Sequence, residues 1–285
     1  MKGIVLAGGT GSRLWPVTKV VSKQLLPIYD KPMIYYPIST LMLAGIREIL
    51  IITTPHDADA FRSLLGDGSQ FGVSFVYASQ PKPEGLAQAF IIGDDFLSGD
   101  SCMMILGDNI FHGVGLGNEL HNVLPHKGAH IFTYEVANPN QYGILNLDAE
   151  GIPSDIQEKP KNSTSNLAVT GLYFFDEQVS KLAKEVTPSE RGELEITSLI
   201  SMYLKLGKLT FTHLSRGTAW LDTGNANSLH DASTYIRIIE ERTGLKIACL
   251  EEIAYRNNWI STETLKDHIA RNVNNQYGEY LARIL

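Results

Sequence analysis

The sequence predicts an α/β protein with a doubly wound, mostly parallel sheet, extended by further β structure and by a C-terminal helical part. Over residues 1–125, short apolar runs alternate with stretches of helical periodicity. Over residues 126–224, β-like runs follow one another through short polar connections, and helical periodicity dominates residues 225–285. Strand–helix alternation is typical of parallel sheets with helices on both faces, so the first part sets the fold class.

The first part is expected to contain four strands and three helices. The strands are rich in β-branched or large apolar residues, and the segments between them carry helical periodicity. The expected strands are 3–6, 49–53, 73–77 and 102–106, and the expected helices are 32–44, 57–65 and 86–96.

The second part is predicted to form an antiparallel extension, because its apolar runs have no long helix between them. Its expected strands are 131–136, 143–147, 152–158 and 169–175. In the third part, Leu229, Ala232, Ile236 and Ile239 recur at the spacing of one helix face. Further helices are expected at 251–256, 262–271 and 276–284. No repeat or flexible linker separates the parts, so we expect one domain.

The composition is that of a globular protein with one sizeable core, since 44% of the 285 residues are hydrophobic and 19% are charged. With a formal net charge of -7, no nucleic acid or anionic membrane is expected as a partner, and a polyanionic substrate would need a metal ion. The apolar start is too short for a signal peptide, and no apolar run approaches the roughly 20 residues of a membrane span. We therefore expect a cytoplasmic protein.

Cysteine and histidine give no sign of a metal site. Cys102 and Cys249 lie far apart among apolar residues, which predicts free buried thiols rather than a disulfide. The histidines never occur as a close pair, so a histidine-based metal site is not expected.

A glycine-rich loop, LAGGTGSRL, follows the first predicted strand, and such glycines let the backbone approach a phosphate closely. A dinucleotide-binding motif beginning at Gly9 would need glycine in place of Leu14, which disfavours an NAD-dependent oxidoreductase. A P-loop beginning at Gly8 would need Gly-Lys where Arg13 and Leu14 stand. The loop leads instead to two cations that suit phosphate, Arg13 and Lys23. A tight surface turn with solvated cations is the alternative interpretation.

Seven blocks of the sequence resemble the glucose-1-phosphate thymidylyltransferases in order and spacing, and together they span effectively the whole chain. They are GIVLAGGTGSRL at 3–14, SKQLLPIYDKPMIYYP at 22–37, QPKPEGLAQA at 80–89, LGDN at 106–109, EKP at 158–160, RGELEIT at 191–197 and WLDTG at 220–224. Many sugar nucleotidyltransferases share the glycine loop, whereas the combination is specific. The resemblance implies a Rossmann-like nucleotidyltransferase fold whose β extension binds the sugar.

Asp108 lies just past an apolar strand, where parallel α/β sheets place their ligands, and shares an edge with the glycine loop if strands 3–6 and 102–106 are parallel. A carboxylate there would repel a triphosphate unless a hard cation stood between them, and Mg²⁺ takes one or two carboxylates plus phosphate oxygens and waters. The resemblance implies that Asp108 and Asp222 are the Mg²⁺ ligands. Without it, Asp222 could equally cap a helix starting near Asn225.

The resemblance further implies where two substrates bind. Lys159 is similar to the residue that holds the sugar phosphate, with Arg191 as a second candidate, and a solvated surface lysine is the alternative. Gln80 and the Gly85 backbone resemble contacts that read thymine, assisted by Gln24. The positions that match the glucose pocket are Gly143, Glu158, Val169 and Tyr173, and Tyr173 could also be a core residue. The expected nucleotide-binding positions are Gly8, Gly9, Gly11, Ser12, Arg13, Lys23, Gln24, Gln80, Gly85 and Asp108.

The implied reaction is direct in-line attack of α-D-glucose 1-phosphate on the α-phosphorus of dTTP, giving dTDP-glucose and pyrophosphate, as the first step toward dTDP-rhamnose. The catalytic set that would align the anions and neutralise charge is Arg13, Lys23, Asp108, Lys159 and Asp222. One methyl separates thymine from uracil, which contributes roughly 0.8 kcal/mol, about fourfold in preference. The alternatives are a nucleotidyltransferase that uses UTP or ATP, and a non-catalytic nucleotide-sugar-binding regulator, which has less need of that set.

The helical tail resembles that of long family members, which are homotetramers with a second nucleotide-sugar site between subunits that permits feedback inhibition by dTDP-rhamnose. Arg216, Glu252, Ile253 and Arg256 match residues near that site. His112 departs from the family pattern, which has tyrosine there for stacking.

Overall fold

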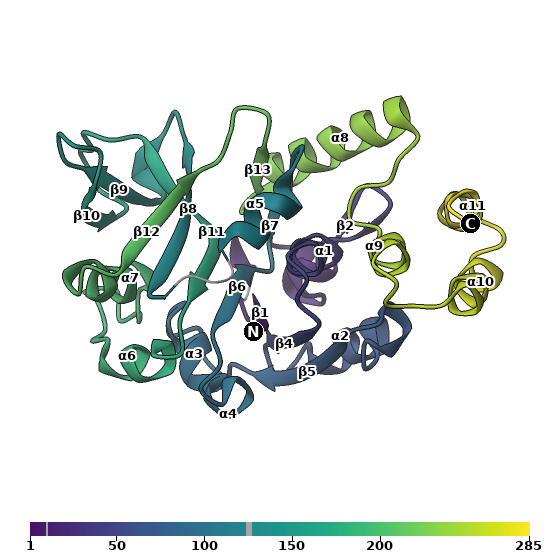
Figure 1. The fold of residues 1–285 in the computed structure, drawn as a ribbon, viewed down its shortest axis with the longest axis horizontal. Helices are drawn as coiled ribbons and strands as arrows, with labels where there is room; N and C mark the ends of the chain where they lie inside the picture. Colours follow the sequence, from purple (N-terminus) through teal and green to yellow (C-terminus); the bar gives the residue numbers. More distant parts are fainter. Residues whose placement is uncertain (10, 124–126) are drawn as a thin grey trace.

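A nine-stranded sheet forms the centre of the computed structural model, which describes residues 1–9, 11–123 and 127–285 (Figure 1). Its main path runs β10-β9-β11-β6-β1-β4-β5. Off this path, β8 pairs with β11, and β12 pairs with β8. The strands are β1 (Lys2–Ala7), β4 (Glu48–Thr53), β5 (Ser74–Ser79), β6 (Cys102–Leu106), β8 (Ala129–Glu135), β9 (Gly143–Leu147), β10 (Pro153–Glu158), β11 (Leu167–Phe175) and β12 (Leu209–His213). Two small sheets pair β2 (Pro27–Ile28) with β3 (Lys31–Pro32) and β7 (Asn109–His112) with β13 (Ala219–Asp222).

Helices cover both faces of the sheet. The helices of the described residues are α1 (Tyr35–Leu43), α2 (Ala58–Leu65), α3 (Gln88–Ile92), α4 (Asp94–Leu97), α5 (Leu116–Val123), α6 (Val179–Glu185), α7 (Ile196–Lys205), α8 (Ala226–Thr243), α9 (Leu250–Arg256), α10 (Thr262–Arg271) and α11 (Gln276–Arg283). Alternate residues of β1 enter different cores: Val5 packs with α1, α2 and α5, whereas Ile4 packs with α3, α6 and α7. The α/β fold predicted from the sequence is thereby confirmed.

The parallel part of the sheet brings two loops to one edge. β1 pairs in parallel with both β4 and β6, and Leu6 lies opposite Leu106 in the register. The loops that follow these two residues, which carry the glycines and Asp108, therefore leave the sheet at the same edge. This confirms the geometry on which the predicted shared site depends.

The predicted antiparallel extension is confirmed for β8, β9, β10 and β11. The sequence did not predict β12, which runs parallel to β8, nor α6 and α7, which follow β11. The helix predicted at 86–96 is instead two short helices, α3 and α4, with Gly93 between them. The spacing of apolar residues did not indicate this break, because α3 and α4 both bury residues in the same core on one side of the sheet.

The predicted C-terminal helices are all present. Ala232 and Ile236 of α8 are buried against Ile28 and Met33 of the β2–β3 segment, while α9, α10 and α11 pack on the core that contains Val5. The division of the chain into three parts stays a prediction, and its boundary at residues 125 and 126 lies outside the described residues. Among the described residues, none of the helices is both long and apolar enough to cross a membrane.

A cluster of four charges, of which Lys31 and Glu240 are buried, ties the β2–β3 segment to the C-terminal part. Lys31 Nζ lies 2.9 Å from Glu240 Oε1, and Lys246 Nζ lies 3.0 Å from Glu240 Oε2. Both lysines also contact Asp30. The backbone N–H of Ile247 donates to Glu240 as well, so the end of α8 and the following loop are fixed to the segment that continues from Lys23.

Candidate active site

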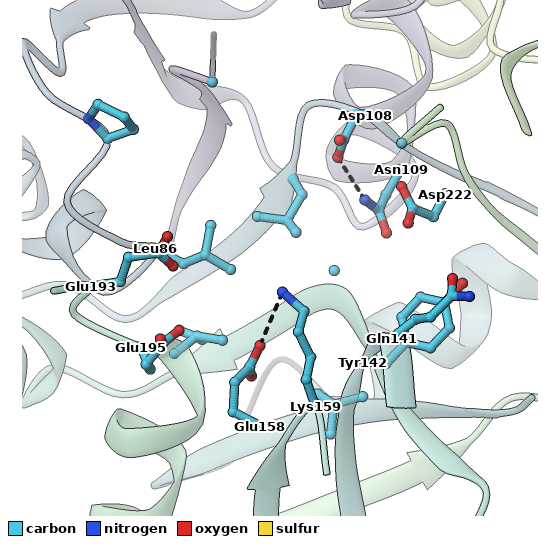
Figure 2. Close-up of a pocket in the computed structure, with 18 of the residues that line it drawn as sticks. Leu86, Asp108, Asn109, Gln141, Tyr142, Glu158, Lys159, Glu193, Glu195 and Asp222 are labelled. Atoms are coloured by element: carbon cyan, nitrogen blue, oxygen red, sulfur yellow. Dashed lines mark hydrogen bonds and ion pairs between the residues drawn. The ribbon is translucent and has the colours of Figure 1, made fainter. Parts of the chain in front are cut away.

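A cavity of about 430 Å³ opens where β1 and β6 end and reaches across to β9, β10 and β11 (Figure 2). In Figure 2, Asp108, Asn109 and Asp222 form one wall, and Glu158 and Lys159 lie across the space from them. Fourteen predicted residues line the cavity: Gly9, Gly11, Ser12, Arg13, Lys23, Gln24, Asp108, Gly143, Glu158, Lys159, Val169, Tyr173, Arg191 and Asp222. Segments far apart in the sequence thus contribute to one site.

The glycine loop and the lysine that follows it bring positive charge to the Asp108 wall. Gly11 has φ +61°, a conformation that favours glycine, and its carbonyl oxygen accepts a 2.7 Å hydrogen bond from Thr18 Oγ1. Lys23 is only 6% exposed, and its Nζ lies 2.6 Å from Asp108 Oδ2. Buried cations are held in place by such pairing, so Lys23 and Asp108 orient one another.

Asp222 reaches the same wall from a different strand. β13 pairs antiparallel with β7, which places Asp222 opposite Asn109. Burial and the charge of Asp108 raise the pKa of Asp222, although Lys23 and Arg13 partly oppose this. Asp222 does not cap α8, because Asn225 does so through a capping box with Ser228. The cap interpretation of Asp222 is therefore wrong.

The carboxylate pair suits a hard divalent cation. Asp222 is destabilised as an anion by burial and by Asp108, and a cation near both groups would offset that cost. Mg²⁺ needs only one or two protein carboxylates when phosphates and waters complete its coordination. Within residues 1–9, 11–123 and 127–285, no group of three or more His, Cys, Asp or Glu could hold a metal ion alone. The donor set thus fits a metal that is shared with a bound phosphate.

Lys159 and Arg191 supply cations on the opposite wall. Lys159 follows β10 with φ +44°, and its Nζ lies 3.5 Å from Glu158 Oε1. Arg191 contacts three carboxylates, and Glu195 accepts from its Nη2 at 2.8 and 2.9 Å. The sequence did not reveal this carboxylate grouping around Arg191, in which Glu195 also begins α7 as its N-cap residue.

Gly8, Gln80 and Gly85 do not line the cavity, in contrast to the other predicted nucleotide-binding residues. Gln80 packs against Gly8, where a Cβ would come within 2.3 Å of Gln80 Oε1. Gln80 Nε2 donates to Gln88 Oε1 at 2.6 Å and to the Gly85 carbonyl oxygen at 3.4 Å. Leu86, next to Gly85, does line the cavity, so these residues lie at its border.

Tyr173 belongs to both the cavity and the core. Its side chain is 3% exposed, and its ring stacks on Phe175 with centroids 6.3 Å apart. Burial and the charge of Glu158 raise its pKa, so the hydroxyl remains protonated at neutral pH. Tyr173 is therefore both a cavity residue and a core residue, so the two predicted alternatives for it hold together.

Several cavity residues were not assigned from the sequence. Asn109 follows Asp108 directly, and Trp220 lies two residues before Asp222, on the same side of β13. Both stand in blocks that carry the family resemblance, which is the signal that could have found them. The remaining unassigned residues include Gln141, Tyr142, Glu193, Glu195 and Thr197.

The residues predicted for a second site lie outside this cavity. Glu252 and Arg256 share α9, where Arg256 Nε donates to Glu252 Oε1 at 2.7 Å, and Ile253 packs on the core. Arg216 is exposed on the loop before β13. His112 Nδ1 lies 2.8 Å from the hydroxyl of Tyr235, and burial lowers the pKa of His112. The ring of Tyr235 thus contacts the position where the family pattern has tyrosine.

Comparison with known proteins identifies relatives of the whole chain. A family profile described as "Nucleotidyl transferase" matches residues 2–238. Glucose-1-phosphate thymidylyltransferases from Neisseria meningitidis and Mycobacterium tuberculosis are each 52% identical, over 100% of this chain and 99% of theirs. A Bacillus anthracis structure assigned as a glucose-1-phosphate thymidylyltransferase, in complex with sucrose, superposes with TM-score 0.77 at 43% identity, covering 83% of this chain and 95% of that one. UDP-glucose pyrophosphorylase shares the fold, with TM-score 0.73 at 24% identity, 84% of this chain and 98% of that chain.

The doubly wound fold, together with the profile match over residues 2–238, defines a nucleotidyltransferase. The relatives that match over the full length of this chain all carry the name of one kind of nucleotidyltransferase. The chain belongs to the glucose-1-phosphate thymidylyltransferase family.

Proposed function

We propose that the protein transfers a thymidylyl group from dTTP to α-D-glucose 1-phosphate, giving dTDP-glucose and pyrophosphate. The names of its full-length relatives support this reaction. The observation that carries the proposal is the division of one cavity into two charged walls. Lys23 and the carboxylate pair form one wall, and Lys159 with Arg191 forms the other.

The two walls suit a reaction between two anions. Arg13 and Lys23 would bind the triphosphate, and Lys159 would hold the sugar phosphate so that its oxygen faces the α-phosphorus. That oxygen is already ionised at neutral pH, so no general base is required and the protein's task is alignment and charge neutralisation. The P–O bond to pyrophosphate breaks as the new P–O bond forms, without a covalent enzyme intermediate.

We assign Mg²⁺ as the cofactor, held by Asp108 and Asp222. When bound, it supplies positive charge that offsets the developing charge on the triphosphate. Lys23 keeps a second positive charge beside Asp108. For the base, Gln80 and Gly85 border the cavity and would read thymine through an amide edge and a backbone group, with Gln24 in the cavity itself.

The test is pyrophosphate release with Mg²⁺ and glucose 1-phosphate against dTTP, UTP, ATP, CTP and GTP, with identification of each nucleotide sugar. We expect dTTP to be preferred, UTP to be a poorer substrate, and all activity to stop when a chelator is added. Preference for ATP or GTP would overturn the base-reading assignment. Nucleotide binding without pyrophosphate release from any of the five would indicate first a different sugar phosphate as the substrate, and second a non-catalytic regulator.

We also propose a homotetramer with a feedback site for dTDP-rhamnose that includes Arg216, Glu252, Ile253 and Arg256. The position of three of these residues on α9, away from the cavity, is compatible with a separate site. Sedimentation of the purified protein tests the assembly. Inhibition by dTDP-rhamnose that competes with dTTP and is unchanged in Arg256→Ala would contradict the separate site. The cytoplasmic location stays a prediction.

A further inference from the structure

Two hydrogen bonds in series reach one oxygen of the Asp108 carboxylate. Trp220 Nε1 donates to Asn109 Oδ1 at 2.6 Å, and Asn109 Nδ2 donates to Asp108 Oδ1 at 2.8 Å. Figure 2 shows Asn109 beside Asp108 and Asp222 on the same wall of the cavity. The proposed reaction gives no role to Asn109 or Trp220.

The chemistry of the three groups fixes the direction of this relay. An indole N–H can only donate, so the group of Asn109 that faces Trp220 must be its carbonyl oxygen. The amide NH₂ of Asn109 must then face the acceptor-only carboxylate of Asp108. With the opposite amide orientation, two oxygens would meet at Asp108 and two N–H groups at Trp220. Trp220 therefore determines that Asn109 acts as a donor toward Asp108.

Packing holds each member of the relay in place. Asn109 is 3% exposed, and a Cβ on the neighbouring Gly171 would come within 2.6 Å of Asn109 Oδ1. The ring of Trp220 packs against Tyr134 and Tyr142, with centroids 5.9 and 5.2 Å away. Little space is available for the amide to turn while the indole is present.

The other hydrogen bonds of Asp108 among the described residues involve Oδ2 and the backbone carbonyl, so Asn109 is the residue that holds Oδ1 in position. Its other oxygen, Oδ2, lies 2.6 Å from Lys23 Nζ. Its backbone carbonyl accepts from Thr223 Oγ1 at 2.8 Å and from Thr223 N at 3.1 Å. Backbone and Oδ2 are thus held from other segments, and the bond from Asn109 sets the rotation of the carboxylate plane.

We propose that Asn109 and Trp220 are positioning residues that set the Asp108 carboxylate for the divalent cation, with Trp220 acting only through Asn109. This inference rests on the proposed function, in which Asp108 is a metal ligand. Groups that orient a metal-binding carboxylate typically change metal affinity by about 10- to 100-fold when they are removed. Neither residue needs to touch the metal or a substrate to have this effect.

The test is a double-mutant cycle on Mn²⁺ affinity. Mn²⁺ is titrated into the full-length protein with dTTP and without sugar phosphate, so that no turnover occurs, and free Mn²⁺ is measured by electron paramagnetic resonance against a dTTP-only blank. Asn109→Leu keeps the shape of the side chain without its amide, and Trp220→Phe keeps an aromatic ring without the N–H. We expect Asn109→Leu to weaken Mn²⁺ binding about tenfold, and Trp220→Phe to weaken it in the same direction.

The double variant decides the mechanism. If Trp220 acts through Asn109, Trp220→Phe has no further effect once Asn109 is leucine, and the two effects are strongly non-additive. If Trp220→Phe weakens binding equally with and without Asn109, the relay is overturned. Trp259→Phe, which removes an indole N–H at a ring that stacks on Arg47, is the matched control and should bind Mn²⁺ as the wild type does.

Two further variants separate the possible failures. Asn109→Ala replaces Asn109→Leu in the cycle if the leucine is not accommodated, as judged by circular dichroism. Asp108→Asn tests the assumption beneath the proposal. Unchanged Mn²⁺ affinity in Asp108→Asn would refute the metal assignment of the proposed function, whereas reduced affinity in Asp108→Asn with an additive cycle would refute the relay alone.

Discussion

Replacement of Lys159 by methionine tests the sugar-phosphate wall with the least disturbance of the fold. The stem length is retained, and the left-handed backbone at φ +44° is equally unfavourable for both residues. The side chain is 39% exposed and its carboxylate partner, Glu158, is 3.5 Å away, so loss of this pair changes stability by less than about 1 kcal/mol. A charge-assisted hydrogen bond to a phosphate contributes about 1.5–3 kcal/mol, which corresponds to about 10- to 150-fold in kcat/KM.

The assay is steady-state pyrophosphate release with each substrate varied in turn. We expect the loss of kcat/KM to be confined to glucose 1-phosphate, with the KM for dTTP unchanged. Lys161→Met, an exposed lysine two residues further along the same connection, is the matched control and should behave as the wild type does. A Lys159→Met enzyme within twofold of wild type, or one with a raised KM for dTTP, would refute the assignment of Lys159.

Asp108→Asn should remove most turnover in pyrophosphate release while circular dichroism stays unchanged, and a wild-type rate would contradict its role. Gly85→Ala should lower Tm and raise the KM for dTTP, because φ is +111° and a Cβ would lie 2.4 Å from the Leu194 backbone. The control is Gly99→Ala, at φ +79° in open space, which should lower the free energy of unfolding by about 1 kcal/mol and leave the KM for dTTP unchanged. Equal KM values for dTTP in the two variants would contradict this. Burial opposes ionisation of Asp30, but Lys31 and Lys246 outweigh it and lower its pKa, so its contribution to stability is present above about pH 3.9 and is lost as pH falls through the lower folded-state pKa. The difference in unfolding free energy between wild type and Asp30→Asn, measured in urea, should therefore shrink in acid, and a constant difference would contradict the lowered pKa.

The sequence predicted the parallel part of the fold because its strands have both faces buried. β1, β4 and β6 are continuous apolar runs, and each alternate residue enters a different core. β7 and β13 were missed because each is only four residues long. Their pairing is non-local, since it joins residues 109–112 to 219–222. That pairing is what places Asp222 opposite Asn109, so the geometry of the carboxylate wall is a property of the fold.

The individual site residues were predictable from motifs, but their partners were not. The sequence indicated Arg191 as a cation for phosphate, yet gave no sign that Glu195 would hold its guanidinium. It indicated Asp108, yet not that Lys23 and Asn109 would each bind one of its oxygens. Such contacts depend on side chains brought together from separate segments, which a linear pattern does not encode. The charge cluster around Glu240 was missed for the same reason.

Nucleotidyl transfer can be followed by ³¹P nuclear magnetic resonance of a mixture of the protein, Mg²⁺, dTTP and glucose 1-phosphate, because both substrates and both products contain phosphorus. We expect the signals of both substrates to be replaced by those of pyrophosphate and of a diphosphate diester with the chemical shifts of authentic dTDP-glucose, and we expect a chelator to abolish the change. Release of inorganic phosphate with formation of dTDP, or unchanged spectra despite bound dTTP, would contradict nucleotidyl transfer to the sugar phosphate.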